Sequence, residues 1–104
     1  EELPEFARSE QGPAIAEELF AVIQDRKEEM RQDSYTTQLF EGGVERIGQK
    51  IVEEAGEVAI AGVKVDKDQV VREVADLVYH ALVLLSACGA RAEDVWQELR
   101  RRRK

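Results

Sequence analysis

No proline follows Pro13, so no proline interrupts a helix in the rest of the chain. That long stretch carries apolar residues three and four positions apart, which is the spacing of one face of an α-helix. Its hydrophobic residues are mainly Ala, Val, Leu and Ile, and aromatic residues make up only 6% of the chain. We therefore predict an all-α fold, with helices over about 13–31, 34–40, 43–63 and 69–88 and a last helix from about residue 92.

Polar residues and glycines mark where these helices should begin and end. Ser34 and Asp68 are suited to cap the helices that follow them. The pair Gly42-Gly43 predicts a hinge, and Gly89 is the residue type expected just past a helix end. The short turn between the two longest helices should fold them into an antiparallel hairpin at the centre of a helical bundle.

At 104 residues the chain has the size of one domain, which we place over 13–104 behind a flexible acidic leader over 1–12. Its net charge of −7 argues against nucleic-acid binding, although acidic residues can recruit a cation for a nucleotide. No apolar run is long enough to cross a membrane and no signal-peptide pattern opens the chain, so we expect a cytoplasmic location. The single Cys88 excludes an intramolecular disulfide, and we expect it to be buried.

The predicted 69–88 helix is apolar nearly all round rather than along one stripe. A helix of this kind is buried on several sides. A chain of 104 residues offers too few other elements to cover all of those sides. We therefore expect an obligate homodimer, with Leu82 at an outer position of this helix.

Two adjacent helices each carry a pair of carboxylates three residues apart, Glu54 with Glu57 and Glu73 with Asp76. Residues at this spacing share a helix face. When the hairpin is folded about Val65, Glu57 falls opposite Glu73 and Glu54 falls opposite Asp76. The same register predicts one band of polar residues along the edge of the core.

Lys50 and His80 extend this band, because they too fall opposite each other when the hairpin is folded. Four acids facing one another would repel strongly unless some are protonated or a cation lies among them. Oxygen ligands suit Mg²⁺, Mn²⁺ or Ca²⁺, and a bound metal would assist attack of water on phosphorus. The other interpretation is two solvated acidic faces without a metal.

The pattern extends beyond the four carboxylates. It comprises Ser34-Tyr35-Thr36, Gly43, Ile47, Lys50, Glu53-Glu54, Tyr79-His80, Gly89 and Asp94-Val95. Over roughly residues 13–99 it resembles phosphoribosyl-ATP pyrophosphatase, whereas the carboxylate pairs alone resemble the wider superfamily of all-α nucleoside triphosphate pyrophosphatases. The resemblance implies a dimeric, Mg²⁺-dependent enzyme that hydrolyses phosphoribosyl-ATP to phosphoribosyl-AMP and pyrophosphate, early in histidine biosynthesis.

The resemblance also implies a role for individual residues. The expected magnesium ligands are Glu54, Glu57, Glu73 and Asp76. Glu53 joins them in the expected catalytic set. The expected substrate-binding residues are Lys50, Arg46, His80, Tyr35 and Ser34.

Some of these residues have plainer explanations. Ser34 can be an N-cap only. His80 can contact substrate or hold Asp76 by a hydrogen bond, and its plainer explanation is a partly buried structural histidine. Trp96 is expected to pack against the core, and the basic run over 100–104 to solubilise a helix end. Two other functions stay open: a house-cleaning pyrophosphatase of dUTP or a damaged nucleotide, and a non-enzymatic helical interaction module.

Overall fold

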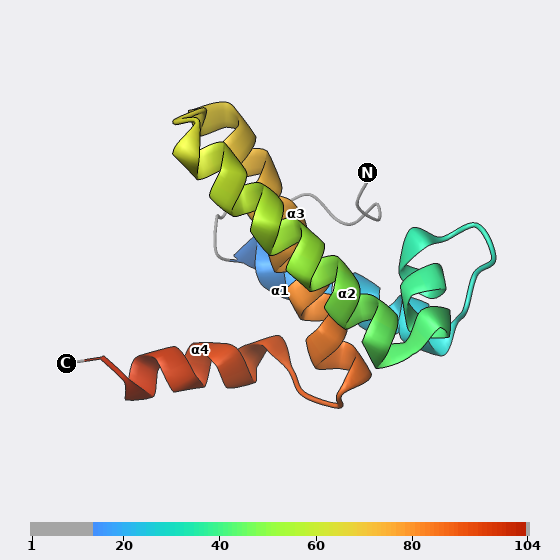
Figure 1. The fold of residues 1–104 in the computed structure, drawn as a ribbon. Helices are drawn as coiled ribbons and strands as arrows, with labels where there is room; N and C mark the ends of the chain where they lie inside the picture. Colours follow the sequence, from blue (N-terminus) through green and yellow to red (C-terminus); the bar gives the residue numbers. More distant parts are fainter. Residues whose placement is uncertain (1–13, 104) are drawn as a thin grey trace.

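Helices make up nearly all of the part of the chain that the computed structural model describes, residues 14–103, and no strand occurs there (Figure 1). They are α1 (Ala14–Glu28), α2 (Tyr35–Val63), α3 (Lys67–Ala87) and α4 (Ala92–Arg101). The all-α prediction is confirmed. The leader predicted over 1–12 lies outside the described residues. Among the described helices, none combines the length and the apolar character needed to cross a membrane.

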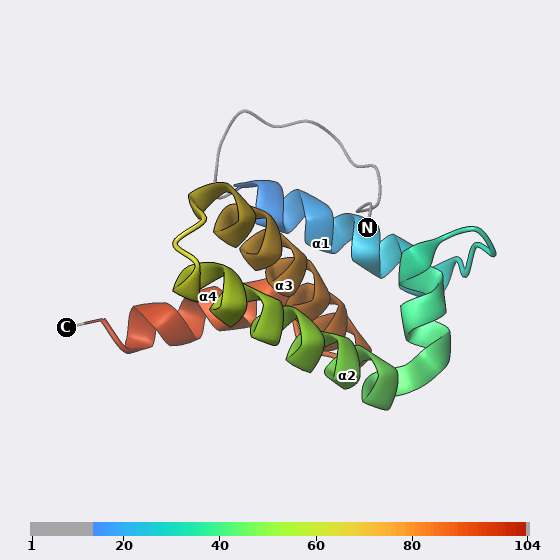
Figure 2. The ribbon, with the colours of Figure 1, turned by 45° about the horizontal axis from the view of Figure 1, so that its top comes forward.

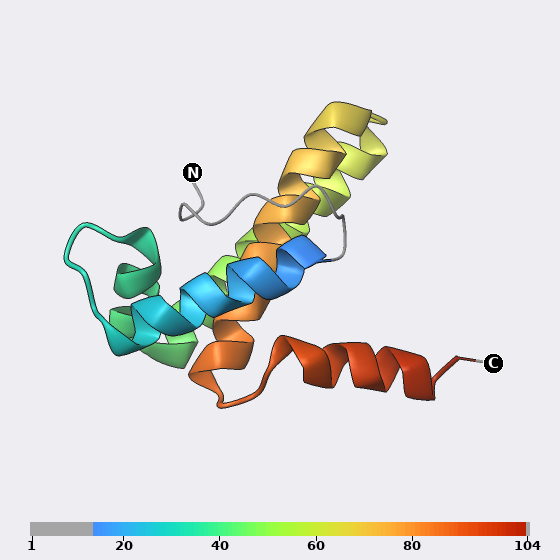
Figure 3. The same ribbon diagram turned by 180° about the vertical axis from the view of Figure 1, so that it is seen from behind.

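Helices α2 and α3 form the central antiparallel hairpin (Figure 1). Helix α1 packs mainly on α3 and also reaches α2 (Figure 2), while α4 packs on α1 and extends away from the hairpin (Figure 3). The three longer helices and the start of α4 all contribute to one core. Its buried apolar side chains are Leu19, Phe20, Ile23, Leu39, Ile47, Tyr79, Leu82, Val83 and Ala92.

The predicted hinge lies inside α2, which is one helix with a break at Gly43. Gly43 has φ 79° and ψ −179°, a backbone conformation that is essentially restricted to glycine. The two helices predicted over 34–40 and 43–63 are therefore two arms of α2. The first arm, residues 35–42, lies at an angle to the rest of α2 and near the end of α1 (Figure 2).

The helix caps confirm some predicted boundaries and correct others. The Ser34 side chain accepts a hydrogen bond from the Thr37 backbone N–H at 3.3 Å and caps α2 as predicted. The prediction that Asp68 caps α3 is wrong. Asp66 is the cap, and its carboxylate accepts from the backbone N–H of Gln69 at 3.1 Å. Helix α3 begins two residues before the predicted start at residue 69. Val65 adopts φ 57°, which reverses the chain within a turn shorter than predicted.

Two predicted positions of side chains are also wrong. Cys88 is exposed, because it lies at the C-cap of α3 where the chain turns away from the core. Leu82 is only 3% exposed and belongs to the core. The outward apolar residues of α3 are instead Val71, Val74 and Val78.

Helix α1 ends at Glu28 rather than near residue 31, and Gly89 follows α3 with φ 78°, as predicted for the residue past a helix end. Trp96 packs against the core as predicted, and its indole N–H also donates to Glu17 Oε1 at 2.6 Å. At the end of α4 three arginines of the basic run pair with glutamates of the same helix. The pairs are Arg100–Glu93, Arg101–Glu98 and Arg102–Glu98.

Candidate metal and active site

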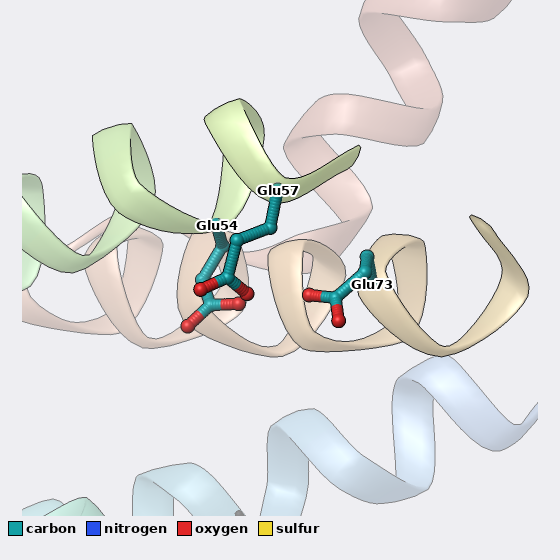
Figure 4. Close-up of side chains that lie close together, drawn as sticks. All are labelled: Glu54, Glu57 and Glu73. Atoms are coloured by element: carbon teal, nitrogen blue, oxygen red, sulfur yellow. The ribbon is translucent and has the colours of Figure 1, made fainter. Parts of the chain in front are cut away.

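Three carboxylates from the two helices of the hairpin, α2 and α3, lie close together (Figure 4). Glu54 and Glu57 come from α2 and Glu73 comes from α3. One carboxylate oxygen of each lies within 4.8 Å of those of the other two. The predicted register is confirmed for Glu57 and Glu73. We call these three residues the acid cluster.

The acid cluster runs from the protein interior to solvent. Glu54 is 4% exposed, Glu73 is half-buried and Glu57 is exposed. Glu73 Oε2 is buried and has no hydrogen-bond partner. A buried carboxylate oxygen without a donor is costly to fold, and this oxygen is free to accept a ligand.

Lys50 supplies positive charge to the acid cluster from one turn earlier on α2. Its Nζ lies 3.4 Å from Glu54 Oε1 and 3.4 Å from Glu53 Oε2. The Lys50 side chain is mostly buried, whereas Glu53 is largely exposed. Lys50 therefore offsets part of the repulsion within the cluster, and Glu53 lies beside the cluster on the solvent side.

Proximity of the acids changes the protonation of the outermost one. A hydrogen bond with Glu73 and the negative charge of Glu73 raise the pKa of Glu57 above its ordinary value of 4.5, and desolvation adds to this. A hydrogen bond with Glu54 and the charge of Lys50 act in the opposite direction. Two close carboxylates raise each other's pKa in this way, because each negative charge disfavours ionisation of the other.

Asp76, the fourth predicted ligand, is not among the three residues of the acid cluster. It is half-buried and lies one helical turn after Glu73 on α3. Its backbone carbonyl oxygen accepts a hydrogen bond from Nδ1 of His80 at 2.7 Å. The structure thus places Asp76 next to the cluster along the helix, and its role as a ligand stays a prediction.

The predicted substrate-binding residues fall in two places. Tyr35 and His80 are joined, since the Tyr35 hydroxyl lies 2.9 Å from His80 Nε2, and Ser34 precedes Tyr35 as the helix cap. Arg46 is exposed on α2, one turn before Lys50, and donates to Gln49 Oε1 at 3.2 Å. Their contacts with a substrate stay predictions.

Sequence reasoning missed a second hydrogen bond between α2 and α3, next to that of Tyr35 with His80. The hydroxyl groups of Thr36 and Tyr79 are hydrogen-bonded at 2.5 Å, and both side chains are buried. Each is the chain neighbour of a member of the Tyr35–His80 pair. That adjacency was visible in the sequence, but only the packing of α2 on α3 brings residues 43 positions apart into contact.

Comparison with known proteins decides which family this site belongs to. A sequence model of phosphoribosyl-ATP pyrophosphohydrolase matches residues 16–103. The chain belongs to this family. It is 43% identical over 90 residues to a phosphoribosyl-ATP pyrophosphatase of Clostridium novyi, covering 86% of this chain and 82% of that protein. Identity to the phosphoribosyl-ATP pyrophosphatase of Pyrobaculum aerophilum is 48% over 90 residues, covering 86% and 96%.

A third relative of this chain is a longer protein. It is the histidine biosynthesis bifunctional protein HisIE of Thermotoga maritima, 41% identical over 92 residues, which are 88% of this chain and 47% of that protein. The family match covers the acid cluster and every predicted site residue. The family description is that of a hydrolase, so family membership confirms the predicted resemblance and the predicted class of enzyme.

Proposed function

We propose that this protein hydrolyses phosphoribosyl-ATP to phosphoribosyl-AMP and pyrophosphate as a step of histidine biosynthesis. The observation that carries the proposal is identity of up to 48%, over most of the chain, with relatives named phosphoribosyl-ATP pyrophosphatase. The name of the HisIE relative supports the place in histidine biosynthesis. The acid cluster, with a basic side chain beside it, fits a reaction at phosphate groups.

The donor set fits a hard divalent cation, Mg²⁺ by preference with Mn²⁺ as a substitute. Glu54, Glu57 and Glu73 would hold it, and Asp76, one turn further along α3, is the fourth candidate. The unpartnered buried oxygen of Glu73 supports this assignment, because a cation would satisfy it. When bound, Mg²⁺ offsets the negative charge of the departing pyrophosphate.

Two side chains beside the acid cluster have the chemistry to assist. Lys50 is a flexible point charge on a mostly buried stem, suited to contact a phosphate oxygen as it gains charge. Glu53 is exposed next to it and is the candidate base that removes a proton from the attacking water. Attack at the α-phosphorus would release pyrophosphate intact.

The protein is proposed to act as a homodimer. Val71, Val74 and Val78 occupy one face of α3 and are 68%, 39% and 43% exposed. Val52 on α2 is also exposed, at 73%. Apolar residues gathered on the hairpin in this way are typical of a surface that another chain covers, and a second copy is the partner implied by the family resemblance.

Product analysis in ¹⁸O-labelled water tests the reaction and its mechanism together. With phosphoribosyl-ATP as substrate we expect pyrophosphate, and label in the phosphate of phosphoribosyl-AMP. Label in pyrophosphate would place attack at the β-phosphorus, and release of orthophosphate would overturn the assignment. A deoxynucleoside triphosphate panel run alongside tests the house-cleaning alternative, which predicts faster turnover of dUTP or a damaged nucleotide.

A further inference from the structure

Beside the acid cluster, three aromatic rings pack together where the start of α2 meets α3. The ring centroids of Tyr79 and His80 are 5.0 Å apart, and that of Tyr35 lies 5.8 Å from His80 and 6.2 Å from Tyr79. His80 and Tyr79 are completely buried. A buried imidazole has no exposed surface for a direct contact with a nucleotide.

The hydrogen bonds of His80 identify its partners and the ring nitrogen that donates to Asp76. The carbonyl oxygen of Asp76 can only accept, so Nδ1 of His80 carries the hydrogen and donates to it at 2.7 Å. In the neutral ring Nε2 is then an acceptor, and the Tyr35 hydroxyl, 2.9 Å away, donates to it. A chain of hydrogen bonds thus runs from Tyr35 through His80 to the backbone of Asp76.

This chain of bonds links two segments that the helices alone do not hold together. Tyr35 is the first residue of α2 and lies on the arm that precedes the break at Gly43. Because the helical conformation is interrupted at Gly43, α2 by itself does not determine the direction of this arm. The Tyr35–His80 bond attaches the arm to α3 one turn after Asp76 and two turns after Glu73.

We propose that Tyr35 and His80 are a positioning pair, which holds the Asp76 turn of α3 in register with the acid cluster without contacting the substrate. The inference rests on the proposed function, since it assigns these residues a role in the same site. Residues that orient the ligands of a metal typically change its affinity by about 10–100-fold when they are lost, and this pair would act on Asp76 through its backbone carbonyl. The proposal therefore concerns cation binding first and turnover second.

Tyr35→Phe is the direct test, because it removes one oxygen atom and keeps the ring against His80 and Tyr79. Isothermal titration of the dimer with Mg²⁺ should show a Kd raised about tenfold. The KM for phosphoribosyl-ATP at saturating Mg²⁺ should stay within about twofold of wild type, because the removed hydroxyl is not a substrate contact.

His80→Asn gives a second, independent measurement. Its amide can still reach the Asp76 carbonyl but not the Tyr35 hydroxyl, so the same bond is lost. The double variant should bind Mg²⁺ no more weakly than His80→Asn alone, because residues that share one interaction are not additive. A double variant whose loss is the product of the two single losses would overturn the proposal.

Ser86→Ala is the matched control for a purely structural effect. Ser86 is also buried on α3, and its hydroxyl donates to Gln24 on α1, away from the acid cluster. It should lower the melting temperature while leaving Mg²⁺ affinity unchanged. If Tyr35→Phe behaves like this control, or raises KM with normal Mg²⁺ affinity, the positioning role is wrong. Absence of turnover in the wild type would instead refute the proposed function, and the Mg²⁺ titration would still test the pair.

Discussion

Replacing Glu73 with glutamine removes one charge from the acid cluster and keeps the shape of the side chain. Glu54 and Glu73 have carboxylate oxygens within 4.8 Å of each other. Two unit charges at that distance repel by about 3.5 kcal/mol at an effective dielectric constant of about 20. Lys50, 3.4 Å from Glu54, and solvent beside the half-buried Glu73 reduce this repulsion. We expect the metal-free variant to be more stable than wild type by about 1 kcal/mol.

Mg²⁺ should reverse this order. A cation that binds only the folded protein stabilises it by about 2.7 kcal/mol when its concentration is a hundred times Kd. Glu73→Gln has lost a charged ligand, so it should gain far less at the same concentration. Wild type should therefore be the less stable protein in chelator and the more stable one in Mg²⁺.

Thermal unfolding in chelator and in a series of Mg²⁺ concentrations measures both effects. For a domain of this size a change of 1 kcal/mol moves the melting temperature by about 4–8 °C. Glu45→Gln is the matched control, since it removes one exposed charge from α2 outside the acid cluster and should change neither curve. If Glu73→Gln is less stable than wild type in chelator, or gains as much from Mg²⁺, the acid cluster is not a repulsive metal site.

Three further predictions follow from single residues. The pKa of Glu57 is raised in the folded state. Its contribution to stability is therefore present below the unfolded pKa of 4.5 and is lost as pH rises through the folded pKa. Denaturation of the metal-free protein at a series of pH values should show this loss in wild type and not in Glu57→Gln. Val78→Glu should convert the proposed dimer to monomer in light scattering, and a dimer of unchanged affinity would contradict the proposed interface. Gly43→Ala should destabilise the protein by about 1–3 kcal/mol, because Gly43 has a φ of 79°. Gly48 lies in a regular helix with open space around it, so Gly48→Ala should stabilise the protein by about 0.5–1 kcal/mol in the same denaturation assay.

The carboxylate pairs show how much of the site local spacing can determine. An α-helix fixes which residues share a face, so Glu54 with Glu57 follows from the sequence alone. The turn between the long helices is short, so the register of Glu57 on Glu73 followed as well. The same reasoning placed Asp76 opposite Glu54, and that pairing stays a prediction.

The sequence by itself determined the helices, the break at Gly43 and the cap at Ser34, because these depend on backbone conformations and neighbours within four residues. Tertiary structure decided what depends on distant segments. Leu82 is in the core and Val78 is exposed because the other helices cover only part of α3, and no periodicity in α3 itself identifies the covered side. The bond between Tyr35 and His80 spans 45 residues, and it forms only because the arm before Gly43 folds back onto α3.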